Sequence, residues 1–454
     1  MKRSAQNGSL VYLIAGAMLL RGAVLLFDAH ALEGDPDGYR ALAVNLVQHG
    51  TFGANEIPTA FRPPLYPLVL AGCVVWGSGT RAAIGLVHWV LGVATVWIAE
   101  RLGRLWGLRR GATLAAALVA CDPILLAQST QLMTETLATF LAAAALLALT
   151  RAQQTGLPRW ALLAGACCGL AVLCRPTFLP WTLLVGPMLA WASRRKQSEW
   201  EKAEAAPRAP PHPAEAEAAR NRRTQPTQRS SRCHAASLLL VFFAGLGLTL
   251  APWALRNLVH FGRPIVTTTH GGYTLLRANN PYYYRHLREA SWGAVWDSAE
   301  LDRQWLAKAP RGTPADELRA DRLAYAEARE NIRRQPLLFV YASLVRLSRF
   351  FGLVPYRTAP QEGALTLSAR YAIGLWYLME LLLALIGVCA VVVEGTRKRK
   401  AENASFGWCF GILMVACFAG IHSVYWTDLR MRAPCMVVIA LAAAAGFRRA
   451  GTRD

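Results

Sequence analysis

Acidic residues are scarce in this chain of 454 residues, in which 28 Asp and Glu stand against 49 Lys and Arg and the formal net charge is +21. A positive excess of this size is compatible with nucleic-acid binding. Much of the Lys and Arg flanks apolar runs, however, as expected where basic residues keep loops on the cytoplasmic side of a membrane. The charge therefore indicates a membrane protein and no nucleic-acid partner.

Two cysteine patterns are also missing. The ten cysteines show neither the spacing of a zinc site nor a disulfide framework. Most of them lie in apolar segments, where Cys behaves as a small hydrophobic residue. The sequence therefore predicts no metal ligands among the cysteines.

Apolar residues are abundant instead. The chain is 54% hydrophobic, and its apolar runs approach the ~20 residues that cross a bilayer. The first run, from Leu10 to Phe27, follows Met1-Lys2-Arg3 and lacks a small-residue cleavage site, which indicates an uncleaved span with a cytoplasmic N-terminus. We predict an all-α, multi-pass protein of the plasma (inner) membrane.

Basic residues decide the predicted topology. The apolar piece 64–76 is short, and counting it as a span would place the basic segment 101–110 outside, so we interpret it as an interfacial helix. The first outer loop then covers 28–81 and contains two interfacial helices. About ten spans result, with both termini cytoplasmic; the spans lie at about 10–27, 82–100, 112–127, 132–150, 160–173, 177–193, 236–255, 371–394, 406–421 and 433–447.

The same reasoning divides the chain into segments. Residues 194–235 are rich in Pro, Ala, Glu, Arg and Gln and predict a disordered cytoplasmic insertion. The segment 256–370, with many Tyr, Trp and charged residues, predicts an extracytoplasmic loop or lid that includes an interfacial or re-entrant helix near 336–355. The predicted segments are therefore an N-terminal transmembrane module 1–193, the insertion 194–235, a span 236–255, the lid 256–370 and the C-terminal spans 371–454.

The first outer loop contains an acidic pair, Asp35 and Asp37 in Gly34-Asp-Pro-Asp-Gly-Tyr39. Apolar residues recur at helical spacing from Tyr39 to Leu46, which predicts an amphipathic helix with the acids at its N-terminus. A carboxylate just outside a span is costly unless water or a function accounts for it. Helix capping explains the pair on local grounds, and a functional site is the alternative.

A second outer loop also offers carboxylates. Asp122-Pro123 suits an ordinary helix end or turn. Glu135, at the start of an apolar span, is the stronger candidate, although a helix N-terminus also favours a wetted carboxylate there. Acids from two loops on one surface indicate a shared site.

Arginines match these acids. The topology places several outside, where Arg is unusual, and their planar guanidinium groups suit phosphate through paired charge-assisted bonds. Snorkelling to lipid headgroups is the alternative. These residues are Arg62, Arg175, Arg256, Arg430 and Arg432.

Two further outer segments are candidates for ligand binding. Ala278-Asn-Asn-Pro281, with Asn279 and Asn280, follows His270-Gly-Gly-Tyr273 and predicts either a ligand-cradling loop or an ordinary turn. His422 precedes Asp428 and Arg430 and is either a metal or base residue or a simple interfacial histidine. The outer carboxylates could hold a divalent metal, but no ligand spacing requires one.

These motifs together resemble the first loop and later segments of the C-type membrane glycosyltransferases. The bacterial family 39 group, related to protein O-mannosyltransferases and the aminoarabinose transferase of lipid A, is most similar. The resemblance covers nearly the whole chain outside 194–235. It is carried by Asp35 four residues before Tyr39, Arg-Pro-Pro-Leu-Tyr-Pro at 62–67 with Tyr66, Leu-Met-Thr-Glu-Thr-Leu at 132–137, Gly-Leu-Ala-Val-Leu-Cys-Arg-Pro at 169–176, Pro-Trp-Ala-Leu-Arg-Asn at 252–257, Gly-Gly-Tyr-Thr-Leu-Leu-Arg-Ala-Asn-Asn-Pro at 271–281 and His-Ser-Val-Tyr-Trp-Thr-Asp-Leu-Arg-Met-Arg-Ala-Pro at 422–434.

The resemblance implies a GT-C-like fold and a sugar donor carried on a polyprenyl phosphate. It implies that Asp35 is the site carboxylate and base. Relatives often have Asp-Glu there, so Asp37 is a candidate for the missing second acid, and Glu135 falls where relatives carry the acid of the second outer loop. The expected reaction moves the sugar to a hydroxyl with inversion and requires no nucleotide or other cofactor. Arginines, chiefly Arg430 and Arg432 with Arg62, would hold the phosphate.

Two other classes of protein are weighed against an enzyme. A transporter or flippase of lipid-linked sugars would use the same charged cavity, but usually shows inverted repeats or ionisable residues at mid-membrane. The sequence has no detectable internal repeat. A membrane scaffold would not need acids and arginines on one face. The donor sugar, the acceptor and the oligomeric state are not encoded in any recognisable motif.

Overall fold

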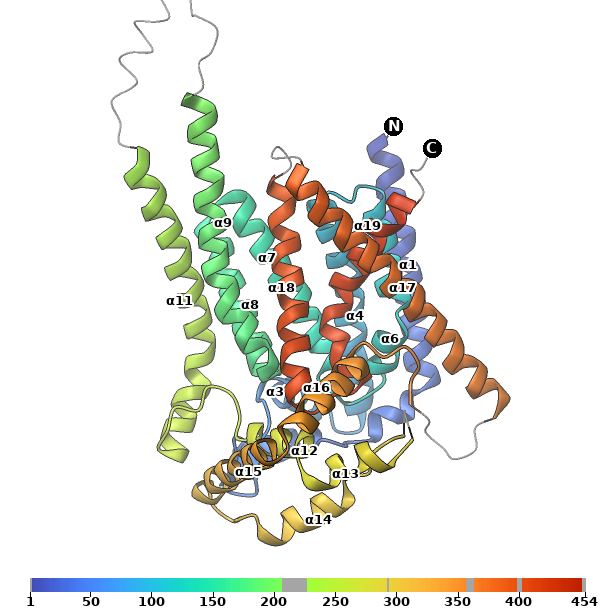
Figure 1. Ribbon diagram of the computed structural model, residues 1–454, viewed down its shortest axis with the longest axis vertical. Helices are drawn as coiled ribbons and strands as arrows, with labels where there is room; N and C mark the ends of the chain where they lie inside the picture. The colour runs from blue at the N-terminus through green and yellow to red at the C-terminus, as the bar shows by residue number, and fades with distance from the viewer. Residues whose placement is uncertain (1, 206–226, 292–293, 357–362, 398–401, 451–454) are drawn as a thin grey trace, which may run out of the picture.

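The chain folds into a bundle of long helices with a helical cap at one end. The computed structural model describes residues 2–205, 227–291, 294–356, 363–397 and 402–450. The long helices run roughly parallel to the bundle axis (Figure 1). Their bounds are α1 (Lys2–Phe27), α4 (Thr80–Leu105), α5 (Gly111–Cys121), α6 (Pro123–Ser129), α7 (Glu135–Thr155), α8 (Pro158–Cys174), α9 (Leu179–Ala205), α11 (Thr227–Phe261), α17 (Ala364–Arg397), α18 (Glu402–Val424) and α19 (Met436–Ala450).

Several of these helices are apolar and long enough to cross a membrane. Among the described residues, seven helical stretches meet both requirements, and an eighth is counted if the bent pair α5 and α6 forms one span. Helix α8 is also apolar but has only 17 residues. The predicted class of polytopic all-α membrane protein is confirmed, and the number of about ten spans stays a prediction.

The predicted span at 112–127 is broken. Helix α5 ends at Cys121 and α6 starts at Pro123, with an angle of 47° between them. Pro123 has no backbone N–H, and Asp122 has an extended backbone and accepts a hydrogen bond from the backbone N–H of Leu125 at 2.8 Å. This local capping ends one helix and starts the next.

Helices α9 and α11 extend into the segment 194–235 that we expected to be disordered. Helix α9 continues to Ala205 and α11 begins at Thr227, and residues 194–205 and 227–235 contain no proline. Residues 206–226 lie outside the described part of the chain.

Small residues let the helices approach closely. A Cβ atom added at Gly165 of α8 would lie 1.9 Å from the carbonyl oxygen of Phe242 in α11. On the other side of the bundle, a Cβ at Gly387 of α17 would lie 1.9 Å from the carbonyl oxygen of Ala442 in α19. Contacts of this kind are typical of membrane helices, which associate by backbone packing rather than by burying apolar area from water.

The cap is built from the first outer loop and the segment 263–356, at the end of the bundle opposite the start of α1 and the end of α19 (Figure 1). The first loop has both predicted short helices and one antiparallel hairpin, in which Gly53 pairs with Pro58 and Ala54 with Ile57. Its elements are η1 (Ala29–Glu33), α2 (Tyr39–His49), β1 (Gly53–Ala54), β2 (Ile57–Pro58), α3 (Leu65–Val74) and η2 (Gly77–Gly79).

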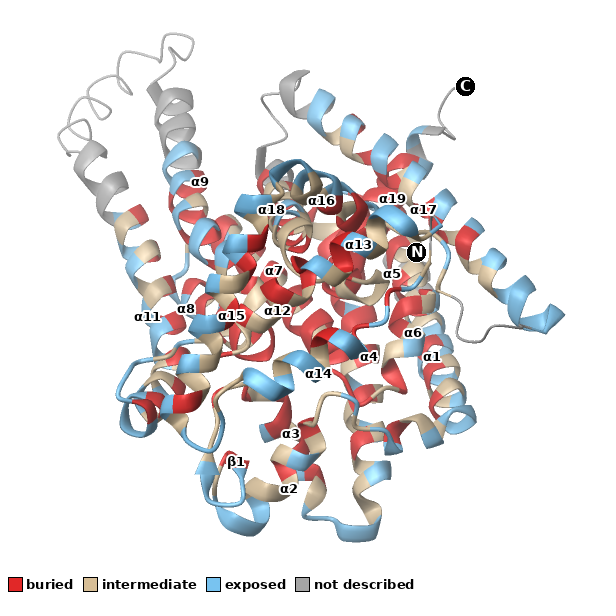
Figure 2. Cartoon of the chain, turned by 60° about the horizontal axis from the view of Figure 1, so that its bottom comes forward, coloured by how far each residue is buried: buried red, intermediate tan, exposed pale blue. Residues whose placement is uncertain are grey.

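The lid, residues 263–356, has its own small core. Buried Leu276, Tyr283 and Tyr284 pack there with Ala324 and Ala328, as the buried residues between α12 and α15 in Figure 2 illustrate. Its helices are α12 (Gly271–Ala278), α13 (Pro281–Glu289), α14 (Ala299–Lys308), α15 (Pro314–Arg334) and α16 (Pro336–Phe350). Two further short helices lie outside the lid, η3 (Pro176–Phe178) and η4 (Leu429–Cys435).

One glutamate fastens the lid to the first loop. Glu317 of α15 accepts hydrogen bonds from the Thr59 hydroxyl at 2.6 Å and from the backbone N–H of Ala60 at 2.9 Å. It also accepts one from the Thr269 hydroxyl. This contact sets the position of the lid over α2 and the hairpin.

Candidate functional site

The N-terminus of α2 holds Asp35 in a fixed position. Its Oδ2 accepts a hydrogen bond from the backbone N–H of Ala41 at 2.9 Å, and Gly38, with φ of 73°, turns the chain into the helix. The capping interpretation of Asp35 is therefore confirmed for this oxygen. The other oxygen, Oδ1, is buried and has no hydrogen-bond partner within the described residues. One half of the carboxylate is thus anchored while the other is unpaired.

Asp37 forms an ion pair with Arg62. The Oδ1 atom of Asp37 lies 3.0 Å from a terminal nitrogen of Arg62, and both side chains are about three-quarters buried. The Arg62 guanidinium carbon lies 5.6 Å from the centre of the Tyr39 ring and 5.5 Å from that of Phe61. These contacts join the acidic turn to the Arg-Pro-Pro segment that leads into α3.

Tyr39 and Tyr66 lie side by side behind this pair. Their rings meet edge to face with centroids 5.4 Å apart, and the Tyr66 hydroxyl lies 3.0 Å from Nε2 of His88. Burial raises the pKa of Tyr39 far above its ordinary value, although Arg62 opposes the shift. Both phenols therefore stay protonated and neutral at physiological pH.

Glu135 brings the second outer loop to the same place. It is 1% exposed at the start of α7, and its Oε1 lies 3.1 Å from a nitrogen of Arg175 and 3.8 Å from Nε of Arg430. Arg430 also pairs with Asp428 at 3.1 Å. Arg175 is held at the C-terminus of α8, where Pro176 prevents the helix from continuing.

These groups form one charged cluster. Tyr39 is within electrostatic reach of Arg62, Asp37, Glu135 and Arg175, and Arg430 is within reach of Asp37 as well as Glu135. The charged cluster consists of residues from five separate parts of the sequence: Asp35, Asp37, Arg62, Glu135, Arg175, Asp428 and Arg430.

Arg432 is placed elsewhere. It is fully buried, its guanidinium carbon lies 4.1 Å from the centre of the Tyr377 ring, and it donates hydrogen bonds to the carbonyl oxygens of Phe350 and Gly352. The helical turn of η4 directs Arg430 to the charged cluster and Arg432 into the bundle. Two of its guanidinium nitrogens, Nε and one terminal nitrogen, have no hydrogen-bond partner within the described residues. Phosphate binding by Arg432, which the resemblance implied, stays a prediction.

Arg256 and the Asn pair also have local structural partners. Arg256 donates to the carbonyl oxygens of Phe52 and Thr59 and stacks on Trp253 at 5.0 Å. Asn279 donates to the carbonyl oxygens of Leu275 and Val424, and Asn280 caps α13 by accepting from the backbone N–H of Tyr283. The ordinary-turn interpretation of Asn279 and Asn280 is therefore the one that the contacts support.

His422 lies near the charged cluster but faces apolar neighbours. Its ring stacks on Phe350 with centroids 5.5 Å apart, and its Nδ1 lies 3.3 Å from the carbonyl oxygen of Trp426. Within the described residues, no group of three or more His, Cys, Asp or Glu side chains is arranged to hold a metal ion.

A cavity of about 900 Å³ opens on the other side of α2. Its wall includes Gly38 and Ala41, whose backbone N–H donates to Oδ2 of Asp35, together with Tyr273 and Trp305 of the lid. The two aromatic rings lie 5.8 Å apart. Trp305 is not among the residues predicted from the sequence, where its place in an aromatic-rich segment is its one signal.

Comparison with known structures identifies the fold. Two structures from the archaeon Archaeoglobus fulgidus are similar to this chain, with TM-scores of 0.51 and 0.50. This chain spans only about half the length of each. The first is an oligosaccharyltransferase in the apo form, with 14% identity and coverage of 97% of this chain and 50% of the other. The second is the oligosaccharyltransferase AglB in complex with an inhibitory peptide and a dolichol-phosphate, with 15% identity and coverage of 98% and 52%.

The fold is therefore that of the C-type membrane glycosyltransferases, as the sequence predicted. Residues 61–205 in addition match the model of the dolichyl-phosphate-mannose-protein mannosyltransferase family, which confirms the resemblance at the level of the superfamily. ArnT from Cupriavidus metallidurans bound to undecaprenyl phosphate is a more distant match, with 12% identity, coverage of 97% of this chain and 78% of the other, and a TM-score of 0.39. No curated protein has a sequence that matches this chain significantly.

Proposed function

We propose that this protein is a membrane glycosyltransferase that moves a sugar from a polyprenyl-phosphate donor to a hydroxyl acceptor. The observation that carries the proposal is the charged cluster, in which Asp35, with one unpaired oxygen, lies in the same short turn as the Asp37–Arg62 pair. Glu135 and Arg430 join it from the other side. The fold and the family match of residues 61–205 support the same class of reaction.

The arginines suit the leaving group. As the bond between the anomeric carbon and the phosphate oxygen breaks, negative charge grows on the phosphate, and positioned guanidinium groups stabilise that charge. Arg62 and Arg430 supply them, and their ion pairs with Asp37 and Asp428 keep them in place before substrate arrives. AglB, whose fold is similar, was solved with a dolichol-phosphate, which supports a lipid phosphate as the carrier here.

Asp35 suits the role of base. The bond from Ala41 N–H fixes one oxygen, and the unpaired Oδ1 accepts the proton of the incoming hydroxyl. The hydroxyl oxygen bonds to the anomeric carbon while the phosphate departs with the bonding electron pair. One in-line displacement of this kind inverts the anomeric configuration. Glu135 holds Arg175 and Arg430 through Oε1, and its Oε2, like Oδ1 of Asp35, has no hydrogen-bond partner within the described residues.

The acceptor would reach Asp35 through the large cavity beside α2. The cavity walls include Gly38 and Ala41, and Tyr273 and Trp305 offer flat aromatic surfaces to a sugar or another bulky acceptor. We assign this end of the bundle to the extracytoplasmic side, with cytoplasmic termini, because the basic loops predicted that orientation. The start of α1 and the end of α19 lie at the opposite end (Figure 1), which is consistent with it.

The test is sugar transfer from radiolabelled polyprenyl-phosphate donors by protein reconstituted in lipid, comparing wild type with Asp35→Asn. Asparagine retains an oxygen that can cap α2 but is a far weaker proton acceptor, so the variant should fold and lose transfer. Asp297→Asn is the matched control, because exposed Asp297 also accepts a backbone hydrogen bond, from Ala299, at 2.9 Å. Unchanged transfer by Asp35→Asn would show that Asp35 caps α2 and is not the base.

The same preparation tests the competing class of protein. If wild type releases no sugar from any donor but moves labelled lipid-linked sugar across the bilayer, the protein is a transporter or flippase and the glycosyltransferase proposal is wrong.

A further inference from the structure

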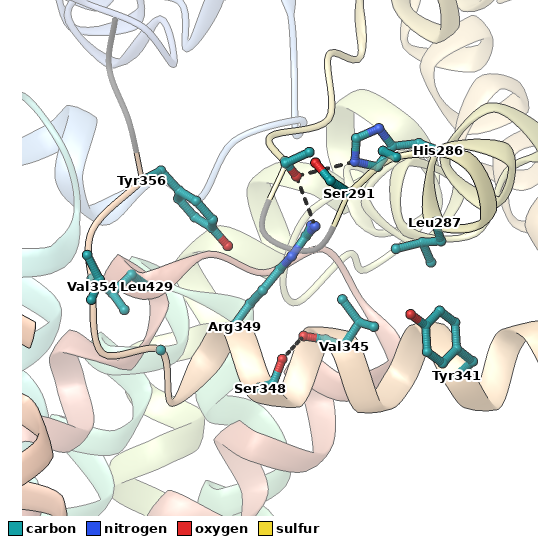
Figure 3. A pocket seen from close by; sticks show the side chains of 13 residues that line it. His286, Leu287, Ser291, Tyr341, Val345, Ser348, Arg349, Val354, Tyr356 and Leu429 are labelled. Carbon is teal, nitrogen blue, oxygen red and sulfur yellow. Dashed lines mark hydrogen bonds between the residues drawn. The ribbon is translucent and has the colours of Figure 1, made fainter. Parts of the chain in front are cut away.

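A second, smaller pocket lies between α13, α16 and the turn that follows α16. Its volume is about 240 Å³, and its polar lining includes His286, Ser291, Arg349 and Tyr356. Figure 3 shows the Arg349 side chain crossing this space, with the Tyr356 ring on one side and Ser291 and His286 on the other. Arg349 lies in the helix expected near 336–355 and is not among the site residues predicted from the sequence.

Arg349 differs from the arginines of the charged cluster in its partners. Arg62, Arg175 and Arg430 each lie within 4 Å of a carboxylate, so their charges are already balanced. Within the part of the chain that the structure describes, Arg349 has no such ion pair. Its hydrogen bonds go to neutral oxygens and are long, 3.3 Å to the Tyr283 hydroxyl and 3.5 Å to the Ala294 carbonyl. A half-buried guanidinium with only weak neutral partners favours an anionic ligand.

The pocket is close to the charged cluster. Leu429, which lines the pocket, directly precedes Arg430 in η4. Tyr356 is within electrostatic reach of both Arg349 and Asp428. Burial also raises the pKa of Tyr356, so its hydroxyl stays protonated and can donate a hydrogen bond to an anion.

The outer face of α16 is suited to a lipid chain. Leu337, Val340 and Leu344 recur at helical spacing, and their side chains are 85%, 54% and 61% exposed. Such an apolar stripe on a helix beside membrane spans is typical of contact with acyl or prenyl chains. Arg349 lies on the pocket side of the same helix (Figure 3), so one lipid can place its chain along α16 and its headgroup in the pocket.

We propose that this pocket binds the phosphate of the free polyprenyl carrier that remains after sugar transfer, with Arg349 as its ionic partner and Tyr356 as a hydrogen-bond donor. Arg62 and Arg430 contact the phosphate of the sugar-bearing donor during the reaction. The inference rests on the proposed function in naming the carrier as the lipid, but binding is measured without any sugar transfer. The two proposals can therefore fail separately.

The test is a titration of undecaprenyl phosphate into the full chain in nanodiscs, with binding followed by intrinsic tryptophan fluorescence. Arg349→Gln should weaken binding at least about tenfold, because a charge-assisted pair is lost. Tyr356→Phe should weaken it less, and Arg349→Lys should restore part of the affinity. Arg285→Gln, on an exposed position of neighbouring α13, is the matched control and should bind as wild type.

Two further lipids distinguish the source of the interaction. Undecaprenol, which lacks phosphate, should bind wild type and Arg349→Gln equally, and phosphatidylglycerol should compete poorly. Unchanged binding of undecaprenyl phosphate by both Arg349→Gln and Tyr356→Phe would overturn the proposal. If Arg349→Gln lost undecaprenol binding to the same extent, Arg349 would be a structural residue. If phosphatidylglycerol competed effectively, the pocket would be a general lipid-phosphate site. Either result contradicts a carrier-specific site.

Discussion

Arg175 and Glu135 form a buried ion pair, 3.1 Å long, between the C-terminal end of α8 and the first residue of α7. The side chains are 10% and 1% exposed. A buried pair of this kind stabilises little by its presence, but removing one partner leaves an uncompensated charge. It is also the contact through which the second outer loop reaches the charged cluster.

The first prediction concerns this pair. Glu135→Gln should lower the free energy of unfolding by about 3 to 5 kcal/mol, because Arg175 keeps its charge in a buried place. Arg175→Met combined with Glu135→Gln should recover part of that loss, since both charges are then gone. Denaturant unfolding of the single and double variants in mild detergent measures the coupling. Strictly additive effects would show that the two residues do not interact.

A second prediction separates two arginines that lie two positions apart. Arg430→Gln should fold normally and reduce sugar transfer on the order of a hundredfold, because it removes a donor to the departing phosphate. Arg432→Gln should mainly destabilise the fold, since Arg432 stacks on Tyr377 and holds two carbonyl oxygens inside the bundle. Thermal unfolding and transfer rates of both variants check this division. Loss of transfer in a fully stable Arg432→Gln variant would show that Arg432 acts in the site rather than in the fold.

The third prediction tests the acceptor cavity. Trp305→Ala should reduce transfer to the acceptor several-fold and leave hydrolysis of the donor by water unchanged, because it alters the cavity wall and not the charged cluster. The ratio of transferred to free sugar is the measurement. Trp76→Ala, at a 71% exposed position outside the cavity, is the control. Equal losses of transfer and hydrolysis would place Trp305 in a role shared by both reactions.

A fourth prediction concerns pH. Burial raises the pKa of Asp321 in α15 to about 6, although the backbone N–H of Gly272 favours its charged form with a hydrogen bond of 2.7 Å. Between its unfolded pKa near 4 and about 6, the folded state binds a proton that the unfolded state has lost. This stabilisation is complete below pH 4 and is lost as the pH rises through 6.

Asp321→Asn keeps an acceptor for Gly272 and cannot titrate, so it should be more stable than wild type at pH 8, with little difference at pH 4. Melting temperatures of both proteins across this range provide the measurement. A wild type that gains stability relative to the variant as pH rises would contradict the shift.

Much of the architecture could be predicted from local patterns. The amphipathic helix beginning at Tyr39, the short apolar helix near 64–76 and the large outer lid follow from helical periodicity and from the placement of basic residues. Asp122-Pro123 is a turn signal in the sequence, but the long apolar run around it led us to predict one continuous span. In the structure, Pro123 and the Asp122 cap end one helix and start another.

The site residues divide in the same way. Asp35, Asp37, Arg62, Glu135 and Arg430 were recognisable as charges that a membrane-proximal segment does not normally carry. Arg432 was indistinguishable from Arg430 in sequence, because only the folded chain gives Arg430 carboxylate partners and Arg432 carbonyl and aromatic partners.

The sequence by itself determined that the protein is a helical multi-pass membrane protein and which charged residues stand beside its apolar runs, because apolar run length and basic flanks act over short stretches of chain. Only the tertiary structure decided which charges meet. Asp37 pairs with Arg62, Glu135 with Arg175 and Arg430, and Arg349 is left with neutral partners beside an apolar stripe. Pairings between distant segments depend on how the helices pack, and packing is a property of the whole bundle rather than of any one segment.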